Sequence, residues 1–288
     1  MKAAAVVDGM HTLLRAESDL RHPRGFLLSL MRDAQRSGVL FEQLLLRSLR
    51  NTYRQSLLGF LWAFIPPIAT ATAFALMGRA KVLSIAPTEL PYVAYVIINM
   101  SLWQTFVEAI NAPITALAEA RAIMTRIYFP KEAMILAKVV EVMISFAVKL
   151  LLIAAVFTWY GLPVRWTATL IPLAVLALIL FGTSIGLILA PLSALYKDVG
   201  KAMPIVFLFW MFMTPVVFPV PETGIFALIV ELNPVTSLLV TIRELAGSPA
   251  LSHLSSFLAI SCVAIAGNII GLLIFRAAMP YVAERVFG

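Results

Sequence analysis

Charged residues are scarce in this chain of 288 residues: Asp, Glu, Lys and Arg together make up 13%, whereas about 25% is usual for a soluble domain. Apolar residues make up 61%, and the mean hydropathy is +0.94. A soluble fold of this length would expose apolar patches large enough to cause aggregation. The composition therefore excludes a soluble protein and indicates an integral membrane protein whose main solvent is lipid.

Residues that build disulfides and metal sites are also few. There is one cysteine, Cys262, which excludes a disulfide framework or a cysteine-based zinc site within one chain. The three histidines are scattered and share no ligand spacing, so we expect no metal site. No secretory signal is visible, because Asp8 interrupts the short apolar stretch 1–7. The first long hydrophobic segment is therefore expected to serve as its own membrane anchor.

What the sequence does contain is a series of long apolar segments. Six of them can cross a hydrocarbon core of ~30 Å at about 1.5 Å per residue, and helices of this kind leave no backbone group without a partner in lipid. The predicted fold class is all-α integral membrane, with a six-helix transmembrane domain over 57–279. The spans are expected at 57–78, 92–117, 139–160, 167–192, 203–220 and 255–279.

The segment 221–243 does not fit this pattern. Glu231, Asn233 and Pro234 divide it into apolar pieces that are too short to span, and Pro215 interrupts any helix that would continue from the fifth span. We expect short re-entrant helices here, which dip into the outer leaflet and are buried against protein.

The formal net charge of +7 is unevenly distributed along the chain. With the amino terminus inside, 17 of the 22 Lys and Arg residues fall in the inner segments 1–56, 118–138, 193–202 and 276–288, and four fall in the outer ones. Positive residues accumulate in cytoplasmic loops, so we expect the tails 1–38 and 280–288 in the cytoplasm. The bias explains the basic excess, and we expect no nucleic-acid partner.

Residues 39–56 have the pattern of an amphipathic helix in the membrane interface. At roughly 100° per residue, Phe41, Leu44, Leu45 and Leu49 share one face. The opposite face carries Arg47, Arg50 and Arg54. The helix could be an anchor on anionic membrane lipid, or it could also form a docking surface for a cytoplasmic partner, and the two roles are compatible.

Several short motifs, spread over nearly the whole chain, are similar to those of a known family. They are Arg50, Tyr53, Ser56, Leu58, Gly59, Trp62 and Pro66 near the first span, Ile127, Phe129 and Pro130 in the second inner loop, Tyr196, Lys197 and Asp198 after the fourth span, Thr214, Pro215, Val216, Phe218 and Pro219 at the end of the fifth, and Asn233, Pro234 and Arg243 beyond it. In this order, on six spans, they resemble type-2 ABC transporter permeases of the branch that exports O-antigen, capsule and teichoic acid polymers. Ser48 and Thr52 depart from the family, which often has an acidic and a basic residue at those positions.

The resemblance implies that two copies of the chain form a pathway across the bacterial cytoplasmic membrane, powered by two copies of a separate ABC ATPase subunit. The implied cargo is a lipid-linked polysaccharide, with O-antigen on polyprenyl diphosphate as the expected case. The alternative is a type-2 permease with the same fold for a small drug or lipid.

The sequence lacks the nucleotide-binding pattern G-x-x-x-x-G-K-[ST], because Gly200 and Lys201 are followed by Ala202. We therefore expect that the chain is not an enzyme and that ATP and Mg²⁺ bind to the partner subunit, with no cofactor in this chain. An enzyme embedded in the membrane is disfavoured further, because no nucleophile or acid–base cluster is present at a membrane edge.

Two basic regions on the inner side are candidate contact sites. The inner loop 118–138 is expected to seat a short helix on the ATPase, although its charges could also serve only to fix the topology. The expected contacts are Arg121, Arg126, Ile127, Phe129 and Pro130. The three arginines of the segment 39–56 could bind the diphosphate of a lipid-linked polymer, although lipid headgroups present the same chemistry.

Ionisable and aromatic residues inside the spans are the remaining candidates. Glu108 and Lys149 lie at similar depths, about 14 and 15 Å from the inner ends of their spans, so we expect a buried pair that either ties two helices together or takes part in gating. Aromatic side chains could line the channel and present their rings to sugars, with packing as the alternative. The candidates are Trp62, Tyr95, Trp103, Phe106, Phe207, Trp210 and Phe212.

Overall fold

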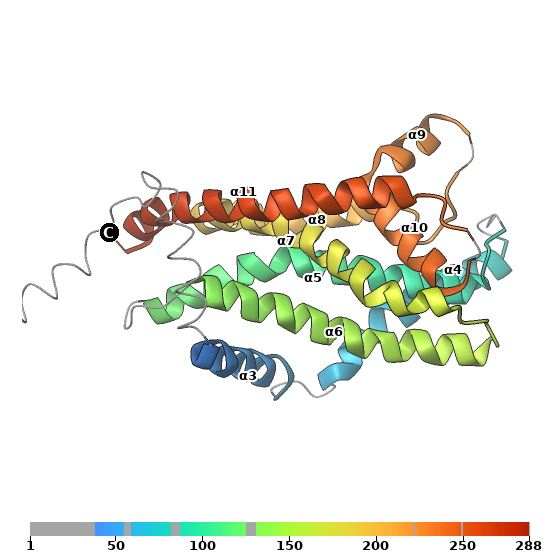
Figure 1. The fold of residues 1–288 in the computed structure, drawn as a ribbon, viewed down its shortest axis with the longest axis horizontal. Coiled ribbons are helices and arrows are strands. Elements are labelled where there is room, and N and C mark those ends of the chain that lie inside the picture. The colour runs from blue at the N-terminus through green and yellow to red at the C-terminus, as the bar shows by residue number, and fades with distance from the viewer. Residues whose placement is uncertain are drawn as a thin grey trace, which may run out of the picture.

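The computed structural model describes residues 38–54, 59–81, 87–124, 131–221, 223–248 and 250–287, and its regular structure in those ranges is helical (Figure 1). The chain begins with α3 (Gly38–Arg54), the short 3-10 helix η2 (Gly59–Ala63) and α4 (Ile65–Arg79). The middle of the chain forms α5 (Tyr92–Met124), α6 (Lys131–Trp159), η3 (Trp166–Leu170) and α7 (Ile171–Leu195). The last elements are α8 (Lys197–Phe212), α9 (Ile225–Leu232), α10 (Pro234–Gly247) and α11 (Leu254–Phe287).

Five helical stretches in the described ranges are long and apolar enough to cross a membrane, and there are six if the bent pair α9–α10 is counted as one span. The five stretches are 61–79, 92–120, 132–159, 166–195 and 254–279. The all-α membrane fold that the sequence predicted is confirmed. The predicted ranges 92–117, 167–192 and 255–279 lie within three of these stretches, whereas the helix that holds most of the predicted span 139–160 begins at residue 132.

The predicted fifth span, 203–220, differs from the helix that forms there. Helix α8 begins at Lys197, ends at Phe212 and has 16 residues, or about 24 Å at the usual helical rise, which is less than the ~30 Å of a hydrocarbon core. Residues 213–216 form turns and residues 217–218 a bend, because Pro215 and Pro219 cannot donate the backbone hydrogen bonds of a continuing helix. The prediction that the fifth span continues to residue 220 is therefore wrong, because the segment 213–220 is not helical.

The segment predicted to be re-entrant forms α9 and α10. The chain bends by 78° between these two helices, at Asn233. The Asn233 amide uses all its main hydrogen-bonding positions: Oδ1 accepts from the backbone N–H of Val235 at 3.1 Å and from Trp210 Nε1 at 3.1 Å. Its Nδ2 donates to the Met213 carbonyl at 3.1 Å and to Thr214 Oγ1 at 2.8 Å. One side chain thus caps α10 and ties the bend to the end of α8.

Glycines let the central helices approach closely. Gly182 of α7 faces α5, where a Cβ atom in its place would lie 2.8 Å from the Cβ of Ala109, and Gly186 lies one turn further on against the same helix. Gly271 of α11 faces α7, where a Cβ atom would lie 2.9 Å from that of Leu187. A spacing of four between small residues is typical of closely packed membrane helices.

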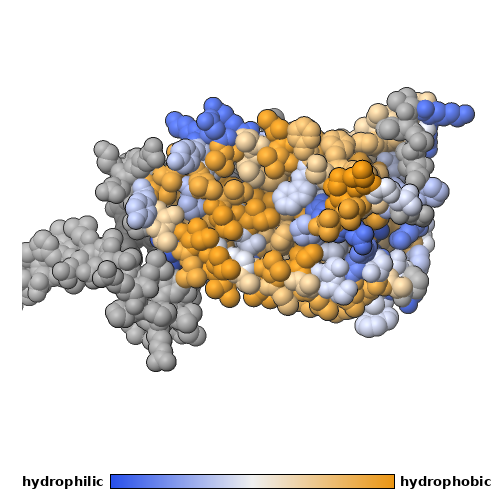
Figure 2. Space-filling view, turned by 90° about the horizontal axis from the view of Figure 1, so that it is seen from above, coloured by the Kyte–Doolittle hydropathy of each residue, from blue (hydrophilic) through white to orange (hydrophobic). Residues whose placement is uncertain are grey.

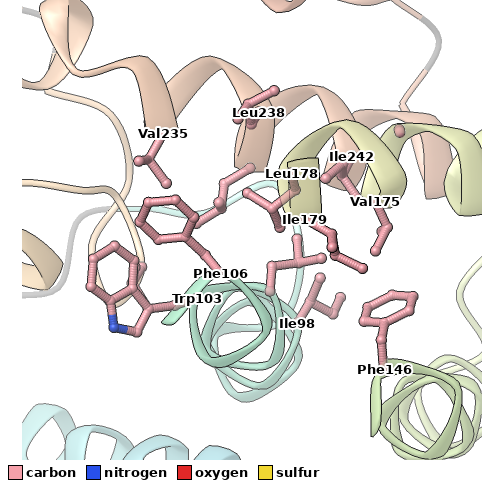
Figure 3. Packing of buried hydrophobic residues seen from close by; sticks show 14 of the residues in the cluster. Ile98, Trp103, Phe106, Phe146, Val175, Leu178, Ile179, Val235, Leu238 and Ile242 are labelled. Carbon is pink, nitrogen blue, oxygen red and sulfur yellow. The ribbon is translucent and has the colours of Figure 1, made fainter. Parts of the chain in front are cut away.

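The apolar core lies where α5, α6, α7 and α10 meet (Figure 3). Helix α10 is buried along nearly its whole length, so it belongs to the core of the bundle and does not face lipid. Core residues shown in Figure 3 include Ile98, Trp103, Phe106, Phe146, Val175, Leu178, Ile179, Val235, Leu238 and Ile242.

The amphipathic helix α3 packs on the beginning of α6, at the same end of the bundle as the last turns of α11 (Figure 1). Leu44 of α3 forms a small apolar cluster with Ala133 and Ala137 of α6. One turn further along α3, the buried Ser48 hydroxyl donates a hydrogen bond to the Glu141 carboxylate. The helix is therefore attached to the membrane domain by apolar and polar contacts.

One face of the bundle is apolar over its middle (Figure 2). Figure 2 shows apolar residues gathered over the centre of one face, with more hydrophilic residues toward its two ends. Helix α11 lies along this side in Figure 1, and its exposed residues include Leu258, Val263, Ile265, Ile269 and Ile270. Such a band is suited to contact with lipid tails.

Candidate functional site

An open cavity of about 830 Å³, called the groove below, lies between η2, α4, α5, α6 and α8. Its lining combines polar side chains with large aromatic ones inside an otherwise apolar bundle. A cavity of this size and mixed lining is typical of a binding site or pathway, so the groove is the candidate functional site.

One wall of the groove is a row of polar side chains on α5, called the polar stripe below. Its members are Gln104, Glu108, Asn111, Thr115 and Glu119. Steps of three or four residues place them on a single face of the helix, one turn after another. Glu108 is the one member of the stripe that was predicted from the sequence, because its three neutral members carry no charge and no aromatic ring by which a single residue stands out.

Aromatic and aliphatic side chains form the rest of the lining. Trp62 of η2, Trp103 of α5 and Phe207 of α8 border the groove, together with Leu208 and Met211. The indole of Trp62 is well exposed, whereas Trp103 and Phe207 are mostly buried. The groove therefore offers both flat apolar faces and hydrogen-bonding groups.

The other four aromatic candidates lie elsewhere. The Tyr95 side chain is buried, and its hydroxyl donates to the carbonyls of Pro215 at 3.0 Å and Phe218 at 2.8 Å. The Phe106 ring is buried and stacks on Phe181 with 5.9 Å between centroids. These contacts hold the core together and keep both rings out of the groove.

Trp210 and Phe212 are also absent from the lining of the groove. The Trp210 indole packs edge-on against Phe106, with 5.2 Å between ring centroids, and donates its N–H to Asn233. Phe212, by contrast, is exposed at the end of α8. An aromatic residue in a span therefore lines the groove only if it lies on the helix face that turns toward the groove and at the depth of the groove in the bundle.

Glu108 of the polar stripe forms an ion pair with Lys149 of α6. The distance from Glu108 Oε1 to Lys149 Nζ is 2.6 Å, and Lys149 Nζ also donates to Thr105 Oγ1 at 3.3 Å. The Lys149 side chain is 0% exposed and that of Glu108 is 38% exposed. The structure therefore brings these two residues together, with the lysine inside the bundle and the carboxylate at the groove.

The end of the groove nearest α3 holds a second charged group. Lys138 of α6 lies 2.8 Å from Glu119 of α5 and 3.2 Å from Glu141 one turn along α6. Glu141 in turn accepts the hydrogen bond from Ser48 of α3. A continuous chain of polar contacts thus runs from α3 through α6 to the polar stripe.

Most of the predicted ATPase contacts fall outside the described residues. Four of them lie in the gap 125–130, namely Arg126, Ile127, Phe129 and Pro130. The side chain of the fifth, Arg121 near the end of α5, is not described either. Just after the gap, Glu132 of α6 pairs with Arg276 of α11 at 2.6 Å, which fixes the start of α6 to the last helix.

The three arginines of α3 are only partly described. Arg47 and Arg50 are exposed on the side of the helix away from Leu44 and Ser48, and the side chain of Arg54 lies outside the description. No group of three or more His, Cys, Asp or Glu that could hold a metal ion is found among the residues with described positions.

Comparison with known proteins gives a consistent result. The family model of the ABC-2 type transporter matches residues 39–246. The chain is 24% identical over 256 residues to the O-antigen export system permease protein RfbA of Myxococcus xanthus, a match that covers 88% of this chain and 92% of that protein. It is 25% identical over 252 residues to a protein of the same name from Klebsiella pneumoniae, covering 83% of this chain and 93% of that protein. A second protein of that name from Klebsiella pneumoniae is 23% identical over 218 residues, covering 72% and 81%.

Proposed function

Since the chain belongs to the ABC-2 type transporter family, we propose that it is the permease subunit of an ATP-driven exporter that moves a lipid-linked polysaccharide across the bacterial inner membrane. The relatives are named as O-antigen export permeases, and we propose O-antigen on polyprenyl diphosphate as the cargo. Two copies of the chain and two ATPase subunits make up the transporter. Both termini lie in the cytoplasm.

The observation that carries this proposal is the lining of the groove. Sugars present apolar faces that pack on aromatic rings and hydroxyl groups that exchange hydrogen bonds with amides and hydroxyls. The groove supplies rings at Trp62, Trp103 and Phe207 and polar groups along the α5 stripe. A wall made of lipid-like side chains alone would suit a small hydrophobic drug, and the polar stripe favours the glycan.

The groove is open, and in this proposal a second copy of the chain closes it into a passage. The exposed apolar residues beside it are candidates for that contact: on α4 they include Ile65, Ile68 and Leu76, and on α8 they include Ile205 and Leu208. Polymer would then move between the two copies, with each copy contributing one polar stripe. Pathways between identical subunits arise naturally from two-fold symmetry.

Energy enters through the inner end of the bundle. ATP and Mg²⁺ bind to the ATPase subunit, which docks on α3 and on the inner loop that includes Arg121, Arg126, Ile127, Phe129 and Pro130. Closure of the ATPase pushes these elements as rigid bodies. The contacts from Ser48 through Glu141 and Lys138 to Glu119 connect α3 with the groove, so a push on α3 reaches the polar stripe.

The arginines of α3 are proposed to meet the cargo before it enters. Arg47 and Arg50 are exposed at the interfacial helix, and their forked donors match the oxygens of a diphosphate. The helical periodicity of the sequence predicts that Arg54 belongs to the same face. The diphosphate would thereby be held at the membrane surface while the glycan enters the groove.

A gene deletion tests the function. Deleting the gene for this chain should remove long-chain O-antigen from the cell surface and leave lipid-linked polymer inside, because synthesis continues while export stops. Expression of the intact chain should restore the surface polymer, and expression of the ATPase subunit alone should not. Unchanged surface O-antigen in the deletion strain, together with altered resistance to a small drug, would contradict the proposal and favour the alternative cargo.

A further inference from the structure

The cations at the groove are already paired with carboxylates. Lys138 is the one Lys or Arg among the described residues that line the groove, and it lies within 2.8 and 3.2 Å of two carboxylates, those of Glu119 and Glu141. Lys149 lies behind the lining, pairs with Glu108 at 2.6 Å and has a fully buried side chain. Neither ammonium group is available to bind an anionic group on a passing molecule.

Carboxylates outnumber these cations three to two, so after pairing the described groups at the groove still carry a net charge of −1. Glu108, Glu119 and Glu141 all line it, and the Glu108 and Glu119 side chains are 38% and 45% exposed. The remaining polar members of the stripe are neutral, namely Gln104, Asn111 and Thr115. Exposed arginines of α3 lie on a different element, outside the lining.

From this distribution of charge we infer that the groove is built for a polymer whose repeating units carry no negative charge, such as a glycan of neutral hexoses or amino sugars. This inference rests on the proposed function, and it narrows the cargo to one chemical class. Polymers of uronic acids, or with phosphate in each repeat, carry the same sign of charge as the lining. The diphosphate of the carrier is common to all such cargoes and does not distinguish them.

The size of the discrimination follows from Coulomb's law in a confined pathway. Two like unit charges about 12 Å apart, in surroundings of effective dielectric constant ~20, repel one another enough to slow passage by about tenfold. Every repeat of an acidic polymer meets this repulsion in turn, and a second copy of the chain doubles the number of carboxylates. A neutral polymer meets only rings, amides and hydroxyls.

The test uses the whole transporter, with this chain and its ATPase subunit in proteoliposomes. Two lipid-linked oligosaccharides are compared, which have the same polyprenyl diphosphate, length and fluorescent terminal residue, but repeats of hexose in one and of the corresponding hexuronic acid in the other. Transport is read as ATP-dependent protection of the fluorophore from dithionite. The hexose polymer should move about tenfold faster, and 1 M salt should reduce the difference, because the Debye length falls to about 3 Å.

Variants assign the effect to the groove. Glu119→Gln removes the net negative charge of the groove and should bring the ratio of the two rates close to one, whereas Glu119→Asp, which keeps the charge, should preserve it. Asp198→Asn removes one carboxylate from the start of α8, outside the groove, where the side chain is 96% exposed, and should leave the ratio unchanged. Equal rates for both polymers in the unaltered transporter, or equal effects of Glu119→Gln and Asp198→Asn on the ratio, would overturn the inference. Transport of neither polymer would overturn the proposed function, and this inference with it.

Discussion

Glu108 and Lys149 lie 41 residues apart in the sequence, and their side chains meet at 2.6 Å between α5 and α6. The lysine is completely buried, whereas the carboxylate reaches the groove. A buried ammonium group without a carboxylate is strongly destabilising, because its hydration is lost and nothing replaces it. A change at this pair should therefore alter both the stability of the bundle and the charge at the groove.

Replacing one partner should cost more than replacing both. Glu108→Leu leaves Lys149 buried without its carboxylate and should lower the free energy of unfolding in detergent by about 3 kcal/mol. The double variant Glu108→Leu, Lys149→Met should recover at least half of that loss. Glu231→Leu, on the exposed side of α9, is the control and should change stability by less than about 0.5 kcal/mol. Equal losses in the single and double variants would contradict the pairing.

The close contact between α5 and α7 should not tolerate a larger residue. In Gly186→Ala the new methyl group would overlap the carbonyl oxygen of Ile110, so the helices must separate, and stability should fall by about 1–3 kcal/mol. Gly200 of α8 is the matched control, because the nearest atom to an added Cβ is 3.8 Å away. Gly200→Ala should be neutral or slightly stabilising, as expected for alanine in a helix. Thermal unfolding in the same detergent compares the two variants.

Asn233 should be required for the bend between α9 and α10. In Asn233→Leu the Trp210 N–H, the Thr214 hydroxyl and the first turn of α10 each lose a partner, and one such loss in a buried site costs about 1–3 kcal/mol. Asn233→Asp keeps an acceptor for Val235 and Trp210 but places a carboxylate oxygen against the Met213 carbonyl, so it should also destabilise the bend. Protease sensitivity of the segment 213–233 reports on the bend directly. A stable, protease-resistant Asn233→Leu protein would show that the bend is held by other contacts.

The exposed face of α3 should contribute to ATPase binding. Reversing the charge in Arg47→Glu, Arg50→Glu should reduce co-purification of the ATPase subunit several-fold while the amount of protein in the membrane stays the same, because Leu44 and Ser48 still hold the helix on α6. Glu42→Gln, an exposed change on the same helix, is the control. Full ATPase recovery with the double variant would leave lipid or diphosphate binding as the role of these arginines.

Hydropathy and charge predicted the membrane fold from the sequence because both depend on composition averaged over a whole span. The same averages could not find the end of α8. Residues 213–218 are as apolar as the helix before them, and only the backbone demands of Pro215 and Pro219 end it at Phe212.

The groove was harder to predict than the spans, because it depends on which face of each helix turns toward it. Depth alone placed Glu108 and Lys149 at one level, since a helix rises by a fixed amount per residue. Depth did not separate Trp103, which lines the groove, from Phe106, which is three residues away and lies in the core. The polar stripe shows which face of α5 turns toward the groove. A neutral residue such as Asn111 does not indicate that face by itself, and the face becomes apparent only from the spacing of all the polar residues together.

The most direct test of the account is to capture the cargo in the groove. A photo-reactive amino acid in place of Asn111, in the middle of the polar stripe, is activated in cells that make lipid-linked O-antigen, and Leu258 on the lipid-facing side of α11 carries the same group as the control. The account predicts a ladder of glycan-bearing adducts at position 111 that disappears when the ATPase subunit is absent, and none at position 258. Adducts at position 258 without any at position 111 would contradict passage of the polymer through the groove.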